Sequence, residues 1–196
     1  YLTDAYLVYA EHIGTSPVIV FNKEDLAETN PNDQLEQLQQ RYRQLGYPVI
    51  HSSCKAPNGL ASLKKQLAGH ISILVGQSGV GKSSIVKNLL PDRDIQTGAV
   101  STATGLGIHT TTTTMLYHLE EGGNLIDSPG VREFSLTHLE PETIRNGFIE
   151  FREQPPCRFN DCTHLREPGC SVLAAVEAGR IDKERWQNYK KMLEAV

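Results

Sequence analysis

The sequence predicts an α/β fold followed by a small, mostly helical second domain. The prediction depends on a glycine-rich loop between an apolar strand and a helix at residues 70–90, a second apolar strand at 17–21, and a late cluster of cysteines with one histidine. Because 196 residues can hold one medium domain and a small appendage, we expect the α/β domain to span residues 1–150 and the second domain residues 151–196.

Composition excludes several classes of protein. The net charge is −4 and basic residues are not clustered, so bulk charge indicates neither a nucleic-acid nor a membrane partner. No apolar run reaches the ~18 residues of a membrane span, and the first residues lack a signal-peptide layout, so we expect a soluble, cytoplasmic protein. The chain begins inside an apparent helix, which indicates a fragment of a longer protein. Four cysteines in such a protein argue against a disulfide framework.

The stretch 70–84 has the spacing of a Walker A phosphate-binding loop, or P-loop. Its glycines let the backbone bend so that successive N–H groups face one phosphate chain, and the next helix directs its positive N-terminal end there. Lys82 would reach the β- and γ-phosphates, and the Ser83 hydroxyl would bind Mg²⁺. The alternative is a glycine turn without a ligand. The positions that we expect to contact a nucleotide are Gly76, Gln77, Ser78, Gly79, Val80, Gly81, Lys82, Ser83 and Ser84.

The strand at 17–21, which we expect to be buried on both faces of a parallel sheet, ends in Asn22-Lys23-Glu24-Asp25. Ligands of open α/β sheets bind beyond the carboxyl ends of the strands. The Asp25 carboxylate could accept hydrogen bonds from the N1–H and the exocyclic amine of guanine, whereas adenine offers no amine there. Guanine recognition is therefore predicted, the alternative being a capped helix start.

The next strand, at 48–51, ends in a turn formed by Ser52, Ser53 and Cys54. Backbone N–H groups of this turn could meet the O6 atom of guanine. We interpret Cys54 as a half-buried structural thiol, because no histidine neighbours it in a recognisable catalytic pattern. Apolar periodicity predicts helices at 3–12, 33–45, 58–67, 172–179 and 182–196, and a hairpin at 112–126.

Residues 92–114 are rich in glycine, serine and threonine, and we interpret them as a switch segment that orders around the γ-phosphate and Mg²⁺. The alternative is a disordered linker. A threonine hydroxyl after His109 could complete the Mg²⁺ shell, and the run of threonines leaves the choice between Thr110 and Thr111 open. Beyond the hairpin, Asp127 would hold Mg²⁺ through water, and the N–H of Gly130 would contact the γ-phosphate.

Val131 follows Gly130, where small GTPases place a glutamine that orients the attacking water. Valine cannot do this, so another group must. His109 is the candidate catalytic residue, the alternative being a solvent-exposed loop histidine, and Arg132 is a second candidate. No arginine finger is evident within the chain, so slow intrinsic hydrolysis is predicted.

Three cysteines and one histidine lie within fourteen positions: Cys157, Cys162, His164 and Cys170. This is the Cys₃His ligand set of a closed, tetrahedral structural zinc site, without the open position that a catalytic zinc needs. For so small a segment the metal would supply much of the folding energy. The alternative is three unconnected cysteines in a loop.

Along the chain, guanine recognition comes first, then phosphate binding, then the two switch segments. Ordinary GTPases have the base-reading motifs last, so the order indicates a circular permutation. This order, with the zinc cluster after it, closely resembles the small-ribosomal-subunit biogenesis GTPases of the RsgA (YjeQ) family. The residues that carry the resemblance are Asn22-Lys23-Glu24-Asp25, Gly76 to Ser83, Gly107-Ile108-His109-Thr110-Thr111, Asp127 to Gly130, and the Cys₃His set.

The resemblance implies an N-terminal OB-fold that this chain lacks, and binding to the maturing 30S subunit and its 16S rRNA near the decoding region. It also implies 30S-stimulated GTP hydrolysis, coupled to late assembly and to release of an assembly factor, with His109 as the catalytic histidine. The implied cofactors are GTP or GDP, Mg²⁺ and one Zn²⁺, and we expect a monomer in solution. Leu106 and Ile108 replace basic residues of many members, which weakens the case for an rRNA contact from that loop.

The first hypothesis is therefore a slow GTPase activated by the small ribosomal subunit. The alternative is a GTP-controlled RNA- or ribosome-binding module in which hydrolysis is incidental. A P-loop ATPase or kinase is disfavoured by the sequence Asn22 to Asp25.

Overall fold

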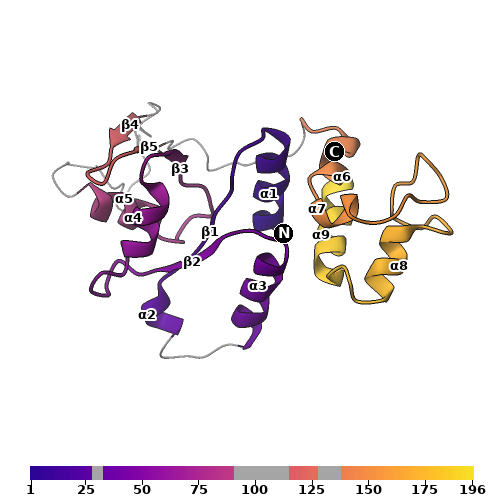
Figure 1. The fold of residues 1–196 in the computed structure, drawn as a ribbon, viewed down its shortest axis with the longest axis horizontal. Coiled ribbons are helices and arrows are strands. Elements are labelled where there is room, and N and C mark those ends of the chain that lie inside the picture. The colour runs from indigo at the N-terminus through magenta and orange to yellow at the C-terminus, as the bar shows by residue number, and fades with distance from the viewer. Residues whose placement is uncertain (28–32, 91–114, 128–137) are drawn as a thin grey trace, which may run out of the picture. The chain divides into compact units, whose positions relative to one another are not determined.

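The computed structural model describes residues 1–27, 33–90, 115–127 and 138–196 (Figure 1). Its helices are α1 (Leu2–His12), α2 (Glu24–Ala27), α3 (Asp33–Gln44), α4 (Ala61–Leu67), α5 (Lys82–Leu89), α6 (Pro141–Asn146), α7 (Ile149–Arg152), α8 (Ser171–Glu177) and α9 (Lys183–Leu193). Its strands are β1 (Ile19–Asn22), β2 (Val49–Ser52), β3 (Ile71–Ile73), β4 (Met115–His118) and β5 (Asn124–Asp127). The described part thus alternates strands and helices first and is helical after residue 138, as the predicted α/β class requires.

The described elements fall into two compact units. The helical unit contains α1, α3 and α6 to α9, and the α/β unit contains the strands with α2, α4 and α5. Helices from the start of the chain are therefore grouped with the segment that carries the cysteine cluster. The expected domain boundary at residue 150 remains a prediction. A division into compact units groups residues by their contacts in space, whereas the expected domains are continuous stretches of the sequence.

Parallel pairing in the α/β unit brings the ends of distant strands together. β1 pairs with β2 from Ile19↔Val49 to Asn22↔Ser52. β5 pairs in parallel with β3 and antiparallel with β4. Parallel neighbours end at the same sheet edge, so Asn22 and Ser52 lie side by side although they come from different strands.

Helices α4 and α5 cover the core of the α/β unit, with their apolar residues on one face of each helix. Leu63 and Leu67 of α4 and Leu89 of α5 are buried against Leu125 of β5, which is fully buried. The expected burial of the first strand on both faces is not reached, since every β1 residue is half-buried. Among the described strands β1 pairs with β2, and a strand becomes buried only where layers cover both of its faces.

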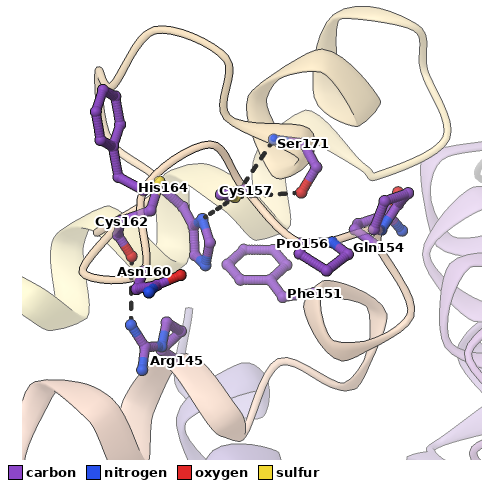
Figure 2. Close-up of a pocket in the computed structure, with 11 residues that line it drawn as sticks. Arg145, Phe151, Gln154, Pro156, Cys157, Asn160, Cys162, His164 and Ser171 are labelled. Atoms are coloured by element: carbon purple, nitrogen blue, oxygen red, sulfur yellow. Dashed lines mark hydrogen bonds between the residues drawn. The ribbon is translucent and has the colours of Figure 1, made fainter.

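The core of the helical unit joins the two ends of the described chain. Ala5 and Val8 of α1 pack in one cluster with Phe148, Phe151 and Tyr189. The three aromatic rings contact one another with centroid distances of 5.0 to 5.3 Å, in stacked and edge-to-face arrangements. Phe151 also lines the pocket drawn in Figure 2.

The periodic helices and the paired strands form within a few residues of the predicted ranges. The short helices α6 and α7 were not predicted from the sequence. Pro141 at the first helical position and Glu142 in the first turn are typical of a helix start and could have indicated α6.

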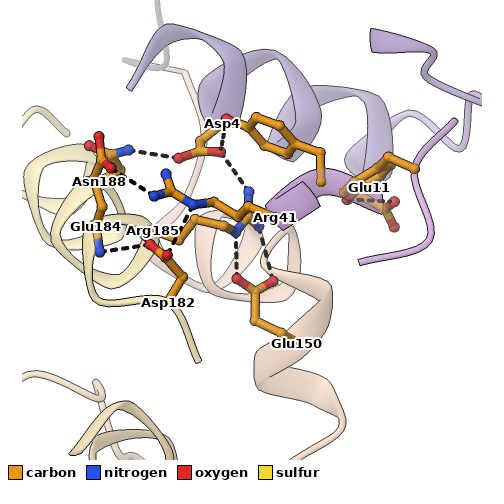
Figure 3. Close-up of polar contacts among 10 residues, drawn as sticks. Asp4, Glu11, Arg41, Glu150, Asp182, Glu184, Arg185 and Asn188 are labelled. Carbon is orange, nitrogen blue, oxygen red and sulfur yellow. Dashed lines mark hydrogen bonds and ion pairs between the residues drawn. The ribbon is translucent and has the colours of Figure 1, made fainter. Parts of the chain in front are cut away.

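A buried cluster of charged groups connects four helices of the helical unit (Figure 3). The Arg185 guanidinium, which is 1% exposed, donates to both carboxylate oxygens of Glu150 at 2.6 and 3.0 Å and to Asp4 at 2.6 Å. Asp4 also accepts hydrogen bonds from Tyr42 at 3.0 Å and Asn188 at 2.7 Å. Every member of this cluster has partners, so burial of these charges is compensated.

Replacing Arg185 with methionine would leave Asp4 and Glu150 buried without their cation. We expect Arg185→Met to lower the free energy of unfolding by about 3–5 kcal/mol. Urea unfolding followed by fluorescence of Trp186, the one tryptophan of the chain, measures the change. Arg180→Met, at an exposed position, is the matched control and should stay within about 0.5 kcal/mol. Equal losses in both variants would contradict the role of the cluster.

Candidate functional site

The P-loop connects β3 to α5 and has the backbone that its glycines permit. Gly76, Gly79 and Gly81 have φ angles of 142°, 82° and 101°, which side chains disfavour. Gly81 is the N-cap of α5, so the N–H groups of the first turn of the helix lie at the end that follows the loop. This arrangement can receive an anion without a further cation, because backbone N–H groups and the helix dipole both favour negative charge.

Lys82 lies over the loop rather than extending into solvent. Its ammonium donates to the carbonyl oxygens of Gly76 at 2.6 Å and Gln77 at 2.7 Å. The positive charge is thus held at the concave side of the loop, where a phosphate chain would lie.

The polar residues that end β1 are tied directly to the P-loop. The Asn22 amide donates to the Val80 carbonyl at 2.9 Å, and the Lys23 ammonium donates to the Gly79 carbonyl at 2.7 Å. Lys23 has a φ of 65°, a left-handed conformation that is uncommon for a side-chain-bearing residue and points to a local constraint. The two motifs found in the sequence therefore belong to one site, although 58 positions separate Asn22 from Val80.

The end of β2 orients the base-recognition residues. Ser52 donates to the Asn22 side-chain oxygen at 3.0 Å, and Ser53 donates to the Asp25 carboxylate at 2.6 Å. The hydrogen bond from Ser53 holds the pKa of Asp25 below its ordinary value, and Lys55, with its ammonium 3.8 Å from the carboxylate, adds to the effect. Asp25 is therefore an ionised acceptor at neutral pH, as recognition of two guanine donors requires.

These residues surround a cavity of about 210 Å³, lined by Asn22, Lys23, Asp25, Leu26, Cys54, Lys55, Gly81 and Ser84. The cavity joins the carboxylate of Asp25 to the N-terminal end of α5. Leu26 and Lys55 were not predicted as site residues, although Leu26 follows Asp25 directly and Lys55 follows Ser53 by two residues. Cys54 belongs to the turn that the sequence predicted at the guanine O6 atom. Burial raises the pKa of the Cys54 thiol, so it is neutral here and unsuited to act as a nucleophile, in agreement with the interpretation from the sequence.

Some of the remaining predicted residues lie in the part of the chain that the structure describes, and others do not. Among the described ones, the Glu24 carboxylate lies 3.2 Å from Nδ1 of His51, and Gln77, Ser78 and Ser83 belong to the P-loop and the start of α5. Asp127 ends β5, one residue beyond the Ile73↔Ile126 pair, so its backbone lies at the sheet edge from which the P-loop emerges. His109, Thr110, Thr111 and Gly130 lie outside the described residues, and their roles remain predictions.

The second candidate site gathers the predicted metal ligands, of which Figure 2 shows Cys157, Cys162 and His164. The ligand atoms of Cys157, Cys162, His164 and Cys170 all lie within 4.8 Å of one another. The Cys157 and Cys170 sulfurs are 3.8 Å apart, and Nδ1 of His164 lies 3.5 Å from the first and 3.3 Å from the second. Zn–S bonds of about 2.3 Å and Zn–N bonds of about 2.0 Å at tetrahedral angles place sulfurs about 3.8 Å apart and sulfur and nitrogen about 3.5 Å apart. The Cys₃His cluster therefore fits a zinc site.

The three thiols of the cluster differ, because burial raises the pKa of Cys162 and of Cys170, whereas the pKa of Cys157 is lowered. Backbone N–H groups of Ser171 and Leu173 point to the sulfurs of Cys157 and Cys170, each at 3.4 Å. Although burial raises the pKa of Cys157, hydrogen bonds from Ser171 and from the neighbouring thiols outweigh it and leave the pKa lowered. Such N–H groups stabilise the deprotonated sulfur that a metal binds.

Gly81 offers a direct test of the contact between the two nucleotide motifs. A Cβ atom at Gly81 would overlap the Asn22 amide, so Gly81→Ala should separate Asn22 from the P-loop. We expect guanine-nucleotide affinity to fall by about tenfold or more, measured by calorimetry with GDP. Gly122→Ala is the control, because Gly122 also has a positive φ of 82° but a Cβ there meets nothing within 4 Å. An unchanged affinity in Gly81→Ala would mean that the contact is dispensable.

Comparisons with known proteins identify the family of the chain. A sequence model of the RsgA GTPase family matches residues 1–137. The chain is 51% identical over 193 residues to a small ribosomal subunit biogenesis GTPase RsgA from Ectopseudomonas mendocina, and 50% identical to one from Pseudomonas putida. Both alignments cover 98% of this chain and 56% of the relative, so the chain spans about half the length of these curated relatives.

Solved structures show the same fold. YjeQ from Thermotoga maritima matches 98% of this chain and 64% of its own, with 38% identity and a TM-score of 0.79. YloQ, described as a circularly permuted GTPase, matches 99% of this chain and 62% of its own, with 31% identity and a TM-score of 0.78.

Among the described residues, no helix is both long and apolar enough to cross a membrane. The permuted order of motifs, the shared nucleotide cavity and these matches lead to one conclusion: this chain belongs to the RsgA GTPase family.

Proposed function

We propose that the chain binds GTP, hydrolyses it slowly and acts in late maturation of the small ribosomal subunit, which stimulates the hydrolysis. One observation carries the nucleotide part of this proposal: Asp25 and Gly81 line the same cavity. A guanine base held at Asp25 can then extend its phosphates over the N-terminal end of α5. The relatives support the ribosomal part, because they are small ribosomal subunit biogenesis GTPases.

Different described residues have different roles in nucleotide binding. Asp25 selects the base, Lys82 neutralises the phosphates, and the N–H groups around Gly81 orient the phosphate chain. The contacts of Asn22 and Lys23 with the P-loop fix the distance between the base and phosphate subsites.

The donor set also fits Mg²⁺, which prefers hydroxyl, carboxylate and water oxygens. Ser83 lies in the first turn of α5, and Asp127 ends the strand that pairs with the strand before the P-loop. We assign Ser83, either Thr110 or Thr111, and Asp127 through water as the residues that would hold the ion. Bound there, Mg²⁺ would neutralise charge that develops on the phosphate oxygens during hydrolysis.

We assign the orientation of the attacking water to His109, because Val131 follows the Gly130 that would contact the γ-phosphate. A histidine in the switch segment that the sequence predicts would reach its position only when the small subunit engages that segment. Such a mechanism would give slow intrinsic turnover together with stimulation by a partner.

We further propose that the Cys₃His cluster holds one structural Zn²⁺. We also propose that the chain acts as a monomer in the cytoplasm and that the 16S rRNA is one of its binding partners. The geometry of the four ligand atoms supports the metal. Four protein ligands would fill a tetrahedral shell, so the metal would shape the surface of the helical unit and take no part in hydrolysis.

Replacing Asp25 with asparagine tests base recognition. The introduced asparagine would present an amide N–H to the exocyclic amine of guanine, so GTP affinity should fall by about tenfold or more. Xanthosine triphosphate, which has a carbonyl at that position, should gain affinity in Asp25→Asn. Competition binding with GTP, XTP and ATP measures both changes, and Glu120→Gln at an exposed turn is the charge-matched control. Unchanged GTP preference in Asp25→Asn would exclude this carboxylate from base recognition.

GTP turnover with and without 30S subunits tests the reaction and the partner together. We expect slow intrinsic hydrolysis that 30S subunits accelerate, and His109→Ala should abolish the acceleration while GTP affinity stays near that of the unmodified protein. Binding to 30S without acceleration would instead favour a GTP-controlled RNA- or ribosome-binding module. Full stimulation of His109→Ala would remove His109 from the mechanism.

A further inference from the structure

The loop from Thr163 to Glu167 presents the one nitrogen ligand of the metal cluster in an unusual backbone conformation. His164 has a φ of 59°, in the left-handed region that residues with side chains rarely adopt. In this conformation its Nδ1 atom lies 3.3 to 3.5 Å from two of the sulfurs. Because a histidine held in this region is strained, other contacts must stabilise the loop.

One carboxylate accepts hydrogen bonds from the backbone on both sides of His164. Glu167 accepts from the N–H of Thr163 at 2.9 Å, of Leu165 at 3.0 Å and of Arg166 at 3.1 Å, and also from the Thr163 hydroxyl. These donors converge on a single side chain that belongs to the same loop. Successive N–H groups that converge in this way form a nest, a backbone shape that an anion stabilises.

Helix α9 binds two carbonyl groups of the same loop. Trp186 donates from its indole nitrogen to the carbonyl of His164 at 2.9 Å, and the Tyr189 hydroxyl donates to the carbonyl of Thr163 at 2.7 Å. With N–H groups bound to Glu167 and carbonyl groups bound to α9, the histidine has little freedom to leave the sulfurs. α9 is in turn fixed by the buried contacts of Arg185.

We propose that Glu167 is a positioning residue for the metal centre: its carboxylate holds His164 in the left-handed conformation that directs Nδ1 into the Cys₃His cluster. The hydrogen bonds of Glu167 go to the backbone around His164 and to Thr163, so it acts on the ligand through the loop. Metal affinity then depends on an anion outside the ligand shell, in the way that outer partners orient ligands at other metal sites. This inference rests on the proposed zinc centre.

Glu167→Gln is the direct test, because glutamine keeps the size of the side chain but replaces one accepting oxygen by a donor that opposes the N–H groups. The unmodified protein should contain close to one zinc per chain and release it slowly to a chromogenic chelator. Glu167→Gln should release zinc about tenfold faster or more. Glu177→Gln, at an exposed position of α8, removes the same charge and should behave like the unmodified protein.

Substitution with Co²⁺ separates positioning from general stability. Co²⁺ bound by three sulfurs and one nitrogen has a characteristic visible spectrum, and loss of the histidine nitrogen should shift it toward the spectrum of His164→Ala. We expect this shift in Glu167→Gln, with partial recovery in Glu167→Asp, which retains the carboxylate. If Glu167→Gln does not fold, Glu167→Asp decides, since its shorter side chain should still give faster zinc release than the unmodified protein.

The outcomes distinguish the two proposals. An unmodified protein that contains no zinc would overturn the zinc centre itself. A zinc-loaded protein whose Glu167 variants keep the release rate and the Co²⁺ spectrum of the unmodified protein would overturn the role of Glu167 alone.

Discussion

The hydrogen bonds between the end of β1 and the P-loop are the constraint on which the proposed nucleotide site depends. Asn22 and Lys23 donate to carbonyl groups of the glycine-rich loop, and Ser52 holds the other end of the Asn22 amide. Three segments that are remote in the sequence thus share one small set of polar atoms. Gly81 has to be a glycine here for two reasons, since its φ is positive and the Asn22 amide fills the space of a Cβ atom.

This constraint also explains why the permuted order of motifs is tolerated. A parallel sheet needs each motif at the carboxyl end of its own strand, and the pairing of β1 with β2 and of β3 with β5 supplies this whichever strand comes first. The contacts in the cavity depend on which strands are neighbours. The order of the strands along the sequence has no effect on those contacts.

The sequence was most informative where chemistry depends on local spacing. The P-loop, the residues from Asn22 to Asp25 and the Cys₃His set are short patterns. The first two contribute to one cavity, and the four ligand atoms of the third lie within 4.8 Å of one another. What the sequence could not predict depends on distant partners. Arg185 reads as an ordinary surface residue of an amphipathic helix until Asp4, 181 positions away, is placed beside it. The half-buried state of β1 likewise follows from its tertiary neighbours.

The packing of α1 against α9 has a consequence for synthesis of the protein. Ala5 and Val8 form one core with residues beyond 140, and Asp4 is neutralised by a guanidinium that the ribosome adds much later. At the usual pace of translation, about 5–20 residues per second, α1 spends roughly ten seconds or more without its final partners. During that interval its apolar face is open to chaperones and to aggregation. The helical unit can therefore complete its core only after α9 has left the exit tunnel.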